Sequence, residues 1–525
     1  MVRFVLVPDR TLMSKYRNVP LGDFLGCVPA KFVPPHIFYF LCKIEPPLPD
    51  GRARVAPYGL RKVEAALVKG GIPKKHVVVA HPDCVHYFID EDTQIVGIHT
   101  MDPLGLGPVS MMFTVGHKYI SYDELEFKKL ISRINLIRKR RGLRFKIVVG
   151  GPGAWQLEYR KEEMKRLGID HVIIGETDHV IVSLFENIAR GDAPEIIHVK
   201  TWPKVEEIPT IINPSIKGLV EIMRGCGRGC RWCLPNLRTA RYMPEEKIIE
   251  EILLNLKHGE TRAWIHSEDV FLYKVEDKIN FLPNREAVVN LFKEISKLKK
   301  YGLKYFNPTH SSIAPVVADP EMIRQLTETI WSVSGKGKWI GIQPGLETGS
   351  PKLIKMHMPN KPKPFSAEEW QDIAVEATCI FNENYWFPAY TLIVGMPGET
   401  EDDAWMTVEM LARMEYEIPR RVGKEKAHFV TAPLAFVPLA ALKGQKFWDA
   451  DKELTEARFA VIYRAWRIIL REVYKSLYSL VEQPPHIKLL ISLISWLGSS
   501  LILRRLEKYG KRRGFNVEKV LAIRP

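Results

Sequence analysis

The chain has 525 residues, more than one ordinary core accommodates, so we expect two domains and an extension. With 46% hydrophobic and 10% aromatic residues and no low-complexity tract, the composition excludes an intrinsically disordered protein. The net charge of +15 favours an acidic partner: nucleic acid, an anionic membrane surface or a phosphate-bearing substrate. Charge alone does not choose among them.

The cysteine content and the first residues indicate the compartment. Seven cysteines are too few for the disulfide framework of a secreted protein, and three of them crowd into one short segment. The start, MVRFVLVPDR, passes directly into a β-like apolar run without the pattern of a signal peptide. We therefore expect a cytoplasmic protein.

The first two hundred residues alternate short apolar runs with helix-like segments. The runs include RFVLV, HVVVAH, QIVGIH, KIVVGG and HVIIGE, and a basic amphipathic stretch lies near residues 124–142. Val- and Ile-rich runs of this kind are typical of strands covered on both faces. The pattern predicts an α/β domain over residues 1–200, with a doubly wound, Rossmann-like parallel sheet.

A connector and two further regions follow. Residues 201–218 contain three prolines and show no sustained hydrophobic periodicity, a pattern that predicts a linker. Over residues 219–425 strand and helix patterns alternate again, and loops follow several apolar runs, which predicts a partial barrel with strand-end loops at one site. Residues 426–525 are expected to be mostly helical. Their uncharged run, Leu489 to Leu503, has 15 residues, fewer than the ~20 needed to cross a bilayer.

A cluster of three cysteines opens the second region. Cys226, Cys230 and Cys233 have the spacing Cys-x3-Cys-x2-Cys in the segment MRGCGRGCRWC, and a helix is expected from Pro244 onward. Three thiolates on one glycine-rich loop can hold three irons of a [4Fe-4S] cluster and leave the fourth iron open. The alternative is a structural zinc site that borrows a distant fourth ligand.

This spacing, with an aromatic residue at Trp232, resembles the signature of the radical S-adenosylmethionine (SAM) superfamily. The resemblance implies a (β/α)6 partial barrel in which the open iron binds the amino and carboxylate groups of SAM. It also implies reductive cleavage of SAM to a 5′-deoxyadenosyl radical that abstracts hydrogen from an unactivated C–H bond. An electron donor for the cluster is then required.

Other segments occur in the order that the resemblance requires. Ser267 and Glu268 follow an apolar run where related enzymes bind the methionine amino group. Gly345 and Glu347, in IQPGLETGS, resemble a segment used near the ribose and carboxylate. Gly395 and Pro397, in LIVGMPGET, resemble the late-strand segment beside adenine. Each segment alone is a weak signal, since a Gly-Met-Pro-Gly run is commonly a strand-to-helix turn.

The first region also has glycine-rich loops at predicted strand ends, where ligands of doubly wound sheets bind. Placed before a radical SAM region, they resemble the cobalamin-binding members of that superfamily, and the likeness covers residues 1–425. It implies a cobalamin site at Asp102, Gly105, Gly107, Gly150, Gly151 and Gly153. The Asp-x-His-x-x-Gly motif of some cobalamin proteins is absent, so a purely structural domain stays open. His86 and His99 are not expected to be cobalt ligands.

The carboxyl-terminal region suggests the substrate. Lys488 and the pair Arg504 and Arg505 bracket the uncharged run, as in a helix lying on the inner face of an anionic membrane. A buried cap helix is the alternative. The profile resembles archaeal enzymes that form rings or bridges in tetraether lipids, so a lipid or small molecule is expected rather than nucleic acid. Two alternatives stay open: cobalamin-dependent methylation of an unactivated carbon, and a non-catalytic cobalamin-responsive or RNA-binding protein.

Overall fold

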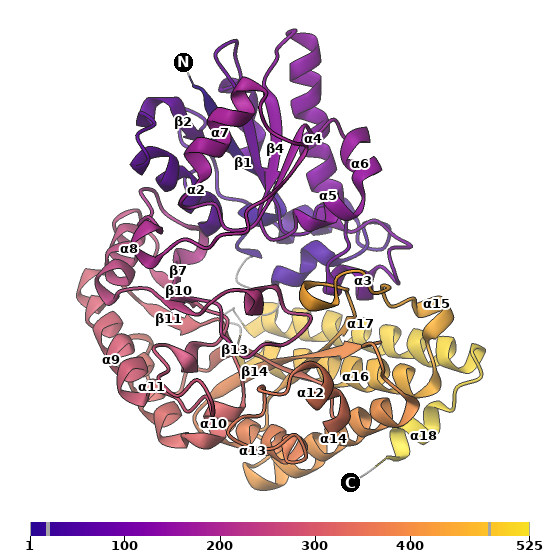
Figure 1. Cartoon of the computed structure of the whole chain (residues 1–525). Coiled ribbons are helices and arrows are strands. Elements are labelled where there is room, and N and C mark those ends of the chain that lie inside the picture. Colours follow the sequence, from indigo (N-terminus) through magenta and orange to yellow (C-terminus); the bar gives the residue numbers. More distant parts are fainter. Residues whose placement is uncertain (1, 17–21, 481–484, 524–525) are drawn as a thin grey trace. The chain divides into compact units, whose positions relative to one another are not determined.

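The computed structural model describes residues 2–16, 22–480 and 485–523 (Figure 1). The chain forms two compact units. One comprises Met1–Val220 together with Met243–Ala263, and the other comprises Glu221–Tyr242 together with Trp264–Pro525. The α/β fold predicted from the sequence is confirmed, with parallel sheets followed by a helical carboxyl-terminal region.

The first unit is built on one parallel sheet with the strand order β2–β1–β3–β4–β5–β6. Its strands are β1 (Phe4–Pro8), β2 (Val77–Val79), β3 (Ile95–His99), β4 (Lys146–Gly150), β5 (His171–Ile174) and β6 (Ile196–His198). The chain reverses its direction of winding between β1 and β3. In open sheets of this order ligands bind at that point, beyond the carboxyl ends of the strands.

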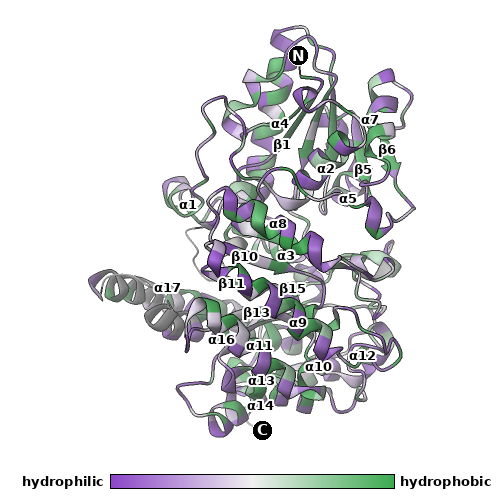
Figure 2. Ribbon diagram, turned by 90° about the vertical axis from the view of Figure 1, so that its left-hand side faces the viewer, coloured by the Kyte–Doolittle hydropathy of each residue, from purple (hydrophilic) through white to green (hydrophobic). Residues whose placement is uncertain are grey.

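Both faces of this sheet are buried. Phe4 and Leu6 of β1 pack with Leu60, Leu67 and Phe185 from two helices, while alternate residues on the other face of β1 are fully buried as well. Figure 2 shows the strands of this sheet as predominantly hydrophobic. This pattern explains why the strands read as continuous apolar runs in the sequence.

The helices of the first unit connect these strands. They are α1 (Pro35–Leu41), α2 (Tyr58–Lys69), α3 (Pro108–Phe113), α4 (Tyr122–Arg140), α5 (Trp155–Tyr159), α6 (Lys161–Arg166), α7 (Ile181–Arg190) and α8 (Glu245–Lys257). The basic amphipathic stretch is α4, which begins at the cap Ser121 and buries Phe127 and Ile131. Helix α8 joins this unit through Glu251, which accepts hydrogen bonds from Tyr58 and Lys62.

The remaining strands form two larger sheets and one short ribbon. The sheets have the orders β11–β10–β7 and β12–β13–β14–β15, the second entirely parallel, and β8 pairs antiparallel with β9. The strands are β7 (Leu219–Glu221), β8 (Met223–Arg224), β9 (Arg241–Tyr242), β10 (Arg262–His266), β11 (Tyr305–Pro308), β12 (His310–Ser311), β13 (Ile340–Glu347), β14 (Trp386–Val394) and β15 (Val430–Ala435).

The strand β15 lies beyond residue 425, where we expected the barrel to end. The region after residue 426 is mostly helical, as expected, but it begins with β15, which extends the parallel sheet next to β14 with six paired residues. Its apolar residues alternate with partly exposed ones over only six positions, and the strongly helical pattern that follows obscured this short strand.

Helices alternate with the later strands and then continue to the carboxyl terminus. They are α9 (Arg285–Ser296), α10 (Ala314–Ala318), α11 (Pro320–Ser334), α12 (Pro351–His357), α13 (Trp370–Glu383), α14 (Glu401–Arg421), α15 (Ala450–Glu453), α16 (Glu456–Leu480), α17 (Pro485–Arg512) and α18 (Val517–Ala522). Helix α16 buries Phe459 and Tyr463 and contacts α14 and β15, so it belongs to the core of the second unit.

Helix α17 contains the uncharged run. Leu489, Leu493 and Trp496 are 67%, 51% and 52% exposed and recur at helical spacing on one face. Among the helices that the structure describes, none combines the length and hydropathy needed to span a bilayer.

Candidate active site

The three cysteines lie on a loop closed at its base by the β8–β9 ribbon. Gly225, Gly227 and Gly229 have φ angles of 76°, 74° and 75°, a backbone conformation that glycine adopts without steric cost. A Cβ atom on Gly225 would lie 2.8 Å from the Arg238 carbonyl oxygen, whereas a Cβ on Gly227 or Gly229 would meet no atom within 4 Å. Glycine therefore lets the loop curl tightly while it borders open space.

The thiols of this loop share a poorly solvated environment. Cys230 is 8% exposed, and the Cys233 N–H donates to the Cys230 carbonyl oxygen at 3.2 Å. Burial raises the pKa of Cys226, and the nearby Cys230 and Cys233 sulfurs raise it further. Burial also raises the pKa of Cys230. Thiolates at these positions therefore need positive charge close by, which metal ions would supply.

Three polar residues follow β10 directly. Ser267 is fully buried, and its hydroxyl has no hydrogen-bond partner. Glu268 accepts from the backbone N–H of Gly225, and burial raises its pKa to about 7. One carboxylate oxygen of Glu268 and one of Asp269 also lack partners. The residues proposed from the sequence for the SAM amino group thus lie against the cysteine loop, and some of their hydrogen-bond acceptors have no partner.

The end of β13 carries a buried ion pair. Glu347 Oε1 lies 2.6 Å from Lys361 Nζ, and Thr391 Oγ1 donates to Glu347 Oε2 at 3.3 Å. Glu347 has a φ of +66° at a bulge in β13, which is strained for a residue with a side chain. A Cβ at Gly345 would lie 2.7 Å from Lys361 Nζ, so glycine there makes room for the pair.

The turn after α12, residues 357–361, joins these parts, and sequence reasoning missed it. Arg228 donates from Nη1 to the carbonyl oxygens of Asn360 and Lys361 at 2.7 and 3.1 Å. Asn360 Nδ2 donates back to the Arg228 carbonyl oxygen at 3.1 Å, and the Arg231 N–H donates to the His357 carbonyl oxygen at 2.9 Å. These reciprocal bonds attach the cysteine loop to the turn that carries Lys361.

The same turn reaches the aromatic residue of the motif and the loop after β14. The His357 ring contacts the half-buried Trp232 ring edge to face at 6.5 Å, and His357 Nε2 lies 2.7 Å from the Pro397 carbonyl oxygen. Burial lowers the pKa of His357, so the neutral ring donates from Nε2 to this carbonyl. The structure thus brings Trp232 and Pro397 to one turn, although they lie far apart in the sequence.

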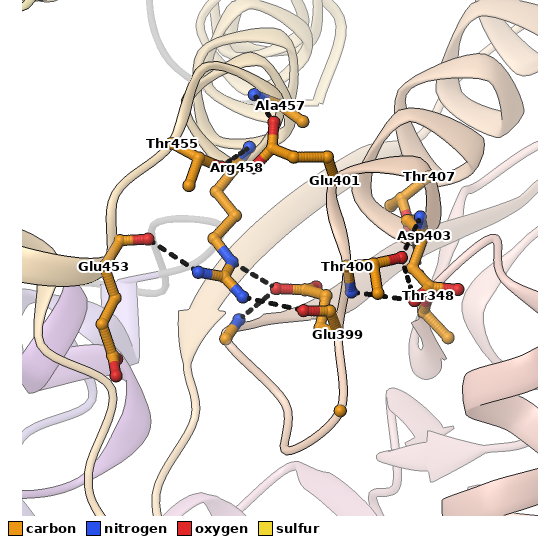
Figure 3. Close-up of polar contacts among 12 residues, drawn as sticks. Thr348, Glu399, Thr400, Glu401, Asp403, Thr407, Glu453, Thr455, Ala457 and Arg458 are labelled. Carbon is orange, nitrogen blue, oxygen red and sulfur yellow. Dashed lines mark hydrogen bonds and ion pairs between the residues drawn. The ribbon is translucent and has the colours of Figure 1, made fainter.

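A clamp from α16 holds the loop after β14 (Figure 3). The Gly395 N–H donates to Glu399 Oε2 at 3.0 Å, and Arg458 Nε lies 2.7 Å from the same oxygen. Arg458 also donates to the carbonyl oxygens of Glu399 and Glu453. A Cβ at Gly395 would lie 2.2 Å from the Trp448 ring, so glycine at this position allows the ring to pack against the backbone.

The loop after β13 is held by α14 in the same figure (Figure 3). Thr407 Oγ1 accepts from the Gly349 N–H at 2.9 Å and lies 3.1 Å from Thr348 Oγ1. Ser350 Oγ donates to Asp403 Oδ1 at 2.6 Å. The loops after β13 and β14 are therefore both fixed to helices, which suits a preorganised binding edge.

Unpaired buried polar atoms gather around the cysteine loop and the neighbouring strand ends. In native proteins nearly all such atoms have partners, so a group of them indicates a polar ligand. Within the described ranges they are Arg228 Nε and Nη2, Ser267 Oγ, Glu268 Oε2, Asp269 Oδ1, Asn307 Oδ1, Ser311 Oγ and His357 Nδ1. Donors and acceptors of both charges fit a zwitterionic ligand beside a three-cysteine metal cluster.

The first unit brings its two candidate loops together at the carboxyl edge of the sheet. Asp102 Oδ1 accepts from the Gly107 N–H at 2.9 Å and from Gln156 Nε2 at 2.6 Å. Gln156 Oε1 in turn accepts from the N–H groups of Leu104 and Leu106. Gln156 belongs to α5, directly after the second loop, so this network ties the loops after β3 and β4 to each other.

The glycines of these loops are close to their neighbours. A Cβ at Gly153 would lie 2.2 Å from the Met101 carbonyl oxygen, and one at Gly151 would lie 2.6 Å from that of Thr100. By contrast, Gly150 has room, with its nearest atom at 3.9 Å. Gly105 has a φ of +63°. Most of these glycines therefore permit contact between the loops themselves.

The two histidines considered from the sequence have ordinary surroundings. Burial lowers the pKa of His99 to about 4, so its ring is neutral at physiological pH, and the ring packs against Gly59 and Gly151. His86 lies in a short 3-10 helix and contacts the Tyr87 ring at 4.3 Å. The expectation that neither binds cobalt stays a prediction.

Comparisons with known proteins agree with the cysteine-loop geometry. Residues 220–411 match the model of the radical SAM superfamily. The tRNA-2-methylthio-N(6)-dimethylallyladenosine synthase of Thermotoga petrophila is 20% identical over 308 residues, covering 56% of this chain and 61% of the relative. The ribosomal protein uS12 methylthiotransferase RimO of Proteus mirabilis is 23% identical over 284 residues, covering 51% and 55%. The matches therefore span about three fifths or less of these relatives.

A solved structure resembles more of the chain. The radical SAM methyltransferase TsrM from Kitasatospora setae, described with cobalamin and a [4Fe-4S] cluster bound, aligns with a TM-score of 0.53 at 15% identity. The alignment covers 84% of this chain and 77% of TsrM. A second TsrM structure, with tryptophan substrate and a SAM analog, aligns with a TM-score of 0.52. The likeness is one of fold.

The superfamily match contains the cysteine loop, the strand ends after β10, β13 and β14, and the turn that carries Lys361. Residues 220–411 therefore match the radical SAM superfamily, and this region contains the three cysteines and the strand-end loops that the sequence indicated.

Proposed function

We propose that the chain binds a [4Fe-4S] cluster through Cys226, Cys230 and Cys233, binds SAM beside it, and modifies an unactivated carbon of its substrate. The observation that carries the proposal is the group of unpaired buried polar atoms around a loop with three cysteines. A cluster with one open iron supplies the electron for reductive cleavage of SAM. The chain must therefore receive electrons from a low-potential one-electron donor.

The residues around the loop suit the polar ends of SAM. Unpaired acceptors on Ser267, Glu268 and Asp269 can take hydrogen bonds from an ammonium group. The buried guanidinium of Arg228 has an Nη2 without a hydrogen-bond partner, which can bind a carboxylate, while its Nε lies 3.6 Å from Asp269 Oδ2. Glu347, fixed by Lys361 and Thr391, is placed to accept from ribose hydroxyls.

Cobalamin-dependent methyl transfer is the reaction that the comparisons support best. The likeness to TsrM, a cobalamin-bound methyltransferase, extends over 84% of the chain and thus beyond the superfamily match. The first unit has the flavodoxin-type strand order, with Asp102 to Gly107 and Gly150 to Gly153 at its ligand-binding edge. Thr100 carries an unpaired buried hydroxyl near this edge, which a ligand could satisfy. We place cobalamin there, without a histidine ligand to cobalt.

The first experiment tests SAM cleavage. The anaerobically reconstituted chain, given SAM and dithionite, should release 5′-deoxyadenosine, detected by chromatography. The triple variant with Cys226, Cys230 and Cys233 changed to alanine should release none, whereas Cys84→Ala and Cys379→Ala should behave as the wild type. Release at an undiminished rate by the triple variant would contradict the proposal.

The second experiment tests methyl transfer and cobalamin. The chain is expressed with hydroxocobalamin, desalted, and incubated with SAM carrying a labelled methyl group and with lipid extract or tRNA in separate reactions. Bound cobalt and label in the product are the expected result. A cobalt-free chain that turns over would show that the first unit is structural.

A lipid substrate is the second candidate, favoured by α17. Its exposed row of Leu489, Leu493 and Trp496 precedes exposed Arg504 and Arg505, an arrangement that fits an anionic membrane surface. If the substrate is a tetraether lipid, ring or bridge formation gives a product with two hydrogens fewer than the substrate. Methylation would instead add a methyl group.

The membrane contact has its own test. Wild-type chain should bind anionic vesicles in a salt-sensitive manner, and changing Leu489, Leu493 and Trp496 together to serine should weaken binding. The matched control changes the exposed Tyr301 to serine, away from α17. Equal binding by wild type and the α17 variant, or binding insensitive to salt, would remove the support for a membrane-bound substrate.

A further inference from the structure

Lys361 is a buried cation beside the cysteine loop that the roles above do not explain. Its side chain is 10% exposed and that of its partner, Glu347, is 9% exposed. Among the described residues, Glu347 is the one acceptor that Lys361 Nζ reaches. The ammonium group has three donors, so two are available to another acceptor.

Lys361 lies beside the cysteine loop. Cys230 stands between Arg228, whose Nη1 donates to the Lys361 carbonyl oxygen, and Arg231, whose N–H donates to the His357 carbonyl oxygen. The turn that carries Lys361 is therefore bonded to the loop on both sides of Cys230.

The position of Lys361 is fixed by the loop itself. Arg228, between two of the cysteines, donates to the Lys361 carbonyl oxygen, and Asn360 next to Lys361 bonds back to Arg228. These bonds hold the backbone of Lys361 against the loop, and the ion pair with Glu347 holds its ammonium group. A charge that is buried, fixed and close acts strongly, because solvent does not screen it.

We infer that Lys361 is a positioning residue that raises the reduction potential of the cluster on Cys226, Cys230 and Cys233 and holds Glu347 in its strained conformation. The inference rests on the proposed function. Adding one electron to the oxidised cluster, from a low-potential donor, increases its negative charge. A fixed cation stabilises that added charge, as net charge and hydrogen bonds to sulfur do in other clusters.

The test is an EPR-monitored redox titration of reconstituted chain without SAM, preceded by iron analysis. Lys361→Met should retain its iron and, at a fixed potential, show about a tenfold lower ratio of reduced to oxidised cluster, a shift of ~59 mV for one electron. Lys361→Arg should recover most of the shift. Lys355→Met is the matched control, because Lys355 lies on α12 but is exposed and pairs with exposed Glu368.

Two further variants cover the case in which Lys361→Met fails to fold around an uncompensated Glu347. Glu347→Gln alone should raise the ratio, and adding Lys361→Met should lower it again about tenfold, since the double variant leaves no buried charge unpaired at this site. Equal potentials in Glu347→Gln and the double variant, or in wild type and Lys361→Met, would overturn the inference. Wild-type chain without any cluster would instead contradict the proposed function, and this inference with it.

Discussion

Glycine-rich loops end strands in both units, but they serve different purposes. In the first unit, a side chain at Gly151 or Gly153 would strike the backbone of the preceding loop, and Gln156 satisfies the polar groups of the loop after β3. In the second unit, Gly227 and Gly229 border open space. The unpaired buried atoms around the cysteine loop include charged groups, those of Arg228 among them.

The comparison shows that a glycine at a strand end does not by itself indicate a ligand. The glycines of the first unit permit two loops to pack on each other, whereas Gly227 and Gly229 permit the cysteine loop to surround a bound group. The buried polar atoms distinguish the two, because the first-unit loops satisfy most of their own hydrogen bonds and leave the neutral Thr100 hydroxyl, whereas charged groups around the cysteine loop lack partners.

The largest expected effect breaks the packing of the first unit. In Gly153→Ala the new Cβ would lie 2.2 Å from the Met101 carbonyl oxygen. Such overpacking should lower the free energy of unfolding by about 3 kcal/mol. Gly150→Ala is the matched control, with its nearest atom at 3.9 Å. Chemical denaturation would measure both, and equal losses would mean that loop packing is not what Gly153 provides.

The second prediction concerns the buried carboxyl of Glu268 in the cluster-free chain. Burial raises its pKa from 4.5 to about 7, so the folded chain binds this proton more tightly than the unfolded chain. The stability of wild type should therefore fall, relative to Glu268→Gln, as the pH rises from about 4.5 to about 7. Above that range the variant should be more stable by up to about 3 kcal/mol.

Thermal unfolding of the two chains from pH 5 to pH 8 measures this difference, and Glu294→Gln, an exposed carboxyl with a surface partner, is the control. A wild-type chain that gains stability over Glu268→Gln with rising pH would contradict a carboxylate whose charged form burial disfavours at this position.

The smallest effect compares two glycines with the same backbone. Gly227 and Gly116 have φ angles of 74° and 70°, and neither Cβ would meet an atom within 4 Å. Alanine at either should cost about 1 kcal/mol through the left-handed conformation alone. Only Gly227→Ala should also reduce iron uptake during reconstitution. Equal iron uptake by the two variants would weaken the view that the open space beside Gly227 is used.

The sequence predicted the fold class because strand burial and helix periodicity are local patterns. It predicted the cysteine loop because one short segment contains all three residues. Strand β15 was missed because six residues carry little periodic signal beside the long helices that follow. Lys361 was missed for another reason: its partner Glu347 is 14 residues away, and in sequence a lysine in a proline-rich turn looks like a solvated one. Contacts between the ends of different strands form only in the folded chain, so no residue spacing in the sequence indicates them.

The central claim is that the unpaired atoms around Cys226, Cys230 and Cys233 belong to a cluster and SAM. Mössbauer and EPR spectra of anaerobically reconstituted chain, before and after SAM, test it most directly. We predict about four irons per chain in a [4Fe-4S] cluster whose signal changes on adding SAM, and no cluster in the triple-alanine variant. A cluster that persists in that variant, or a wild-type signal indifferent to SAM, would contradict the account.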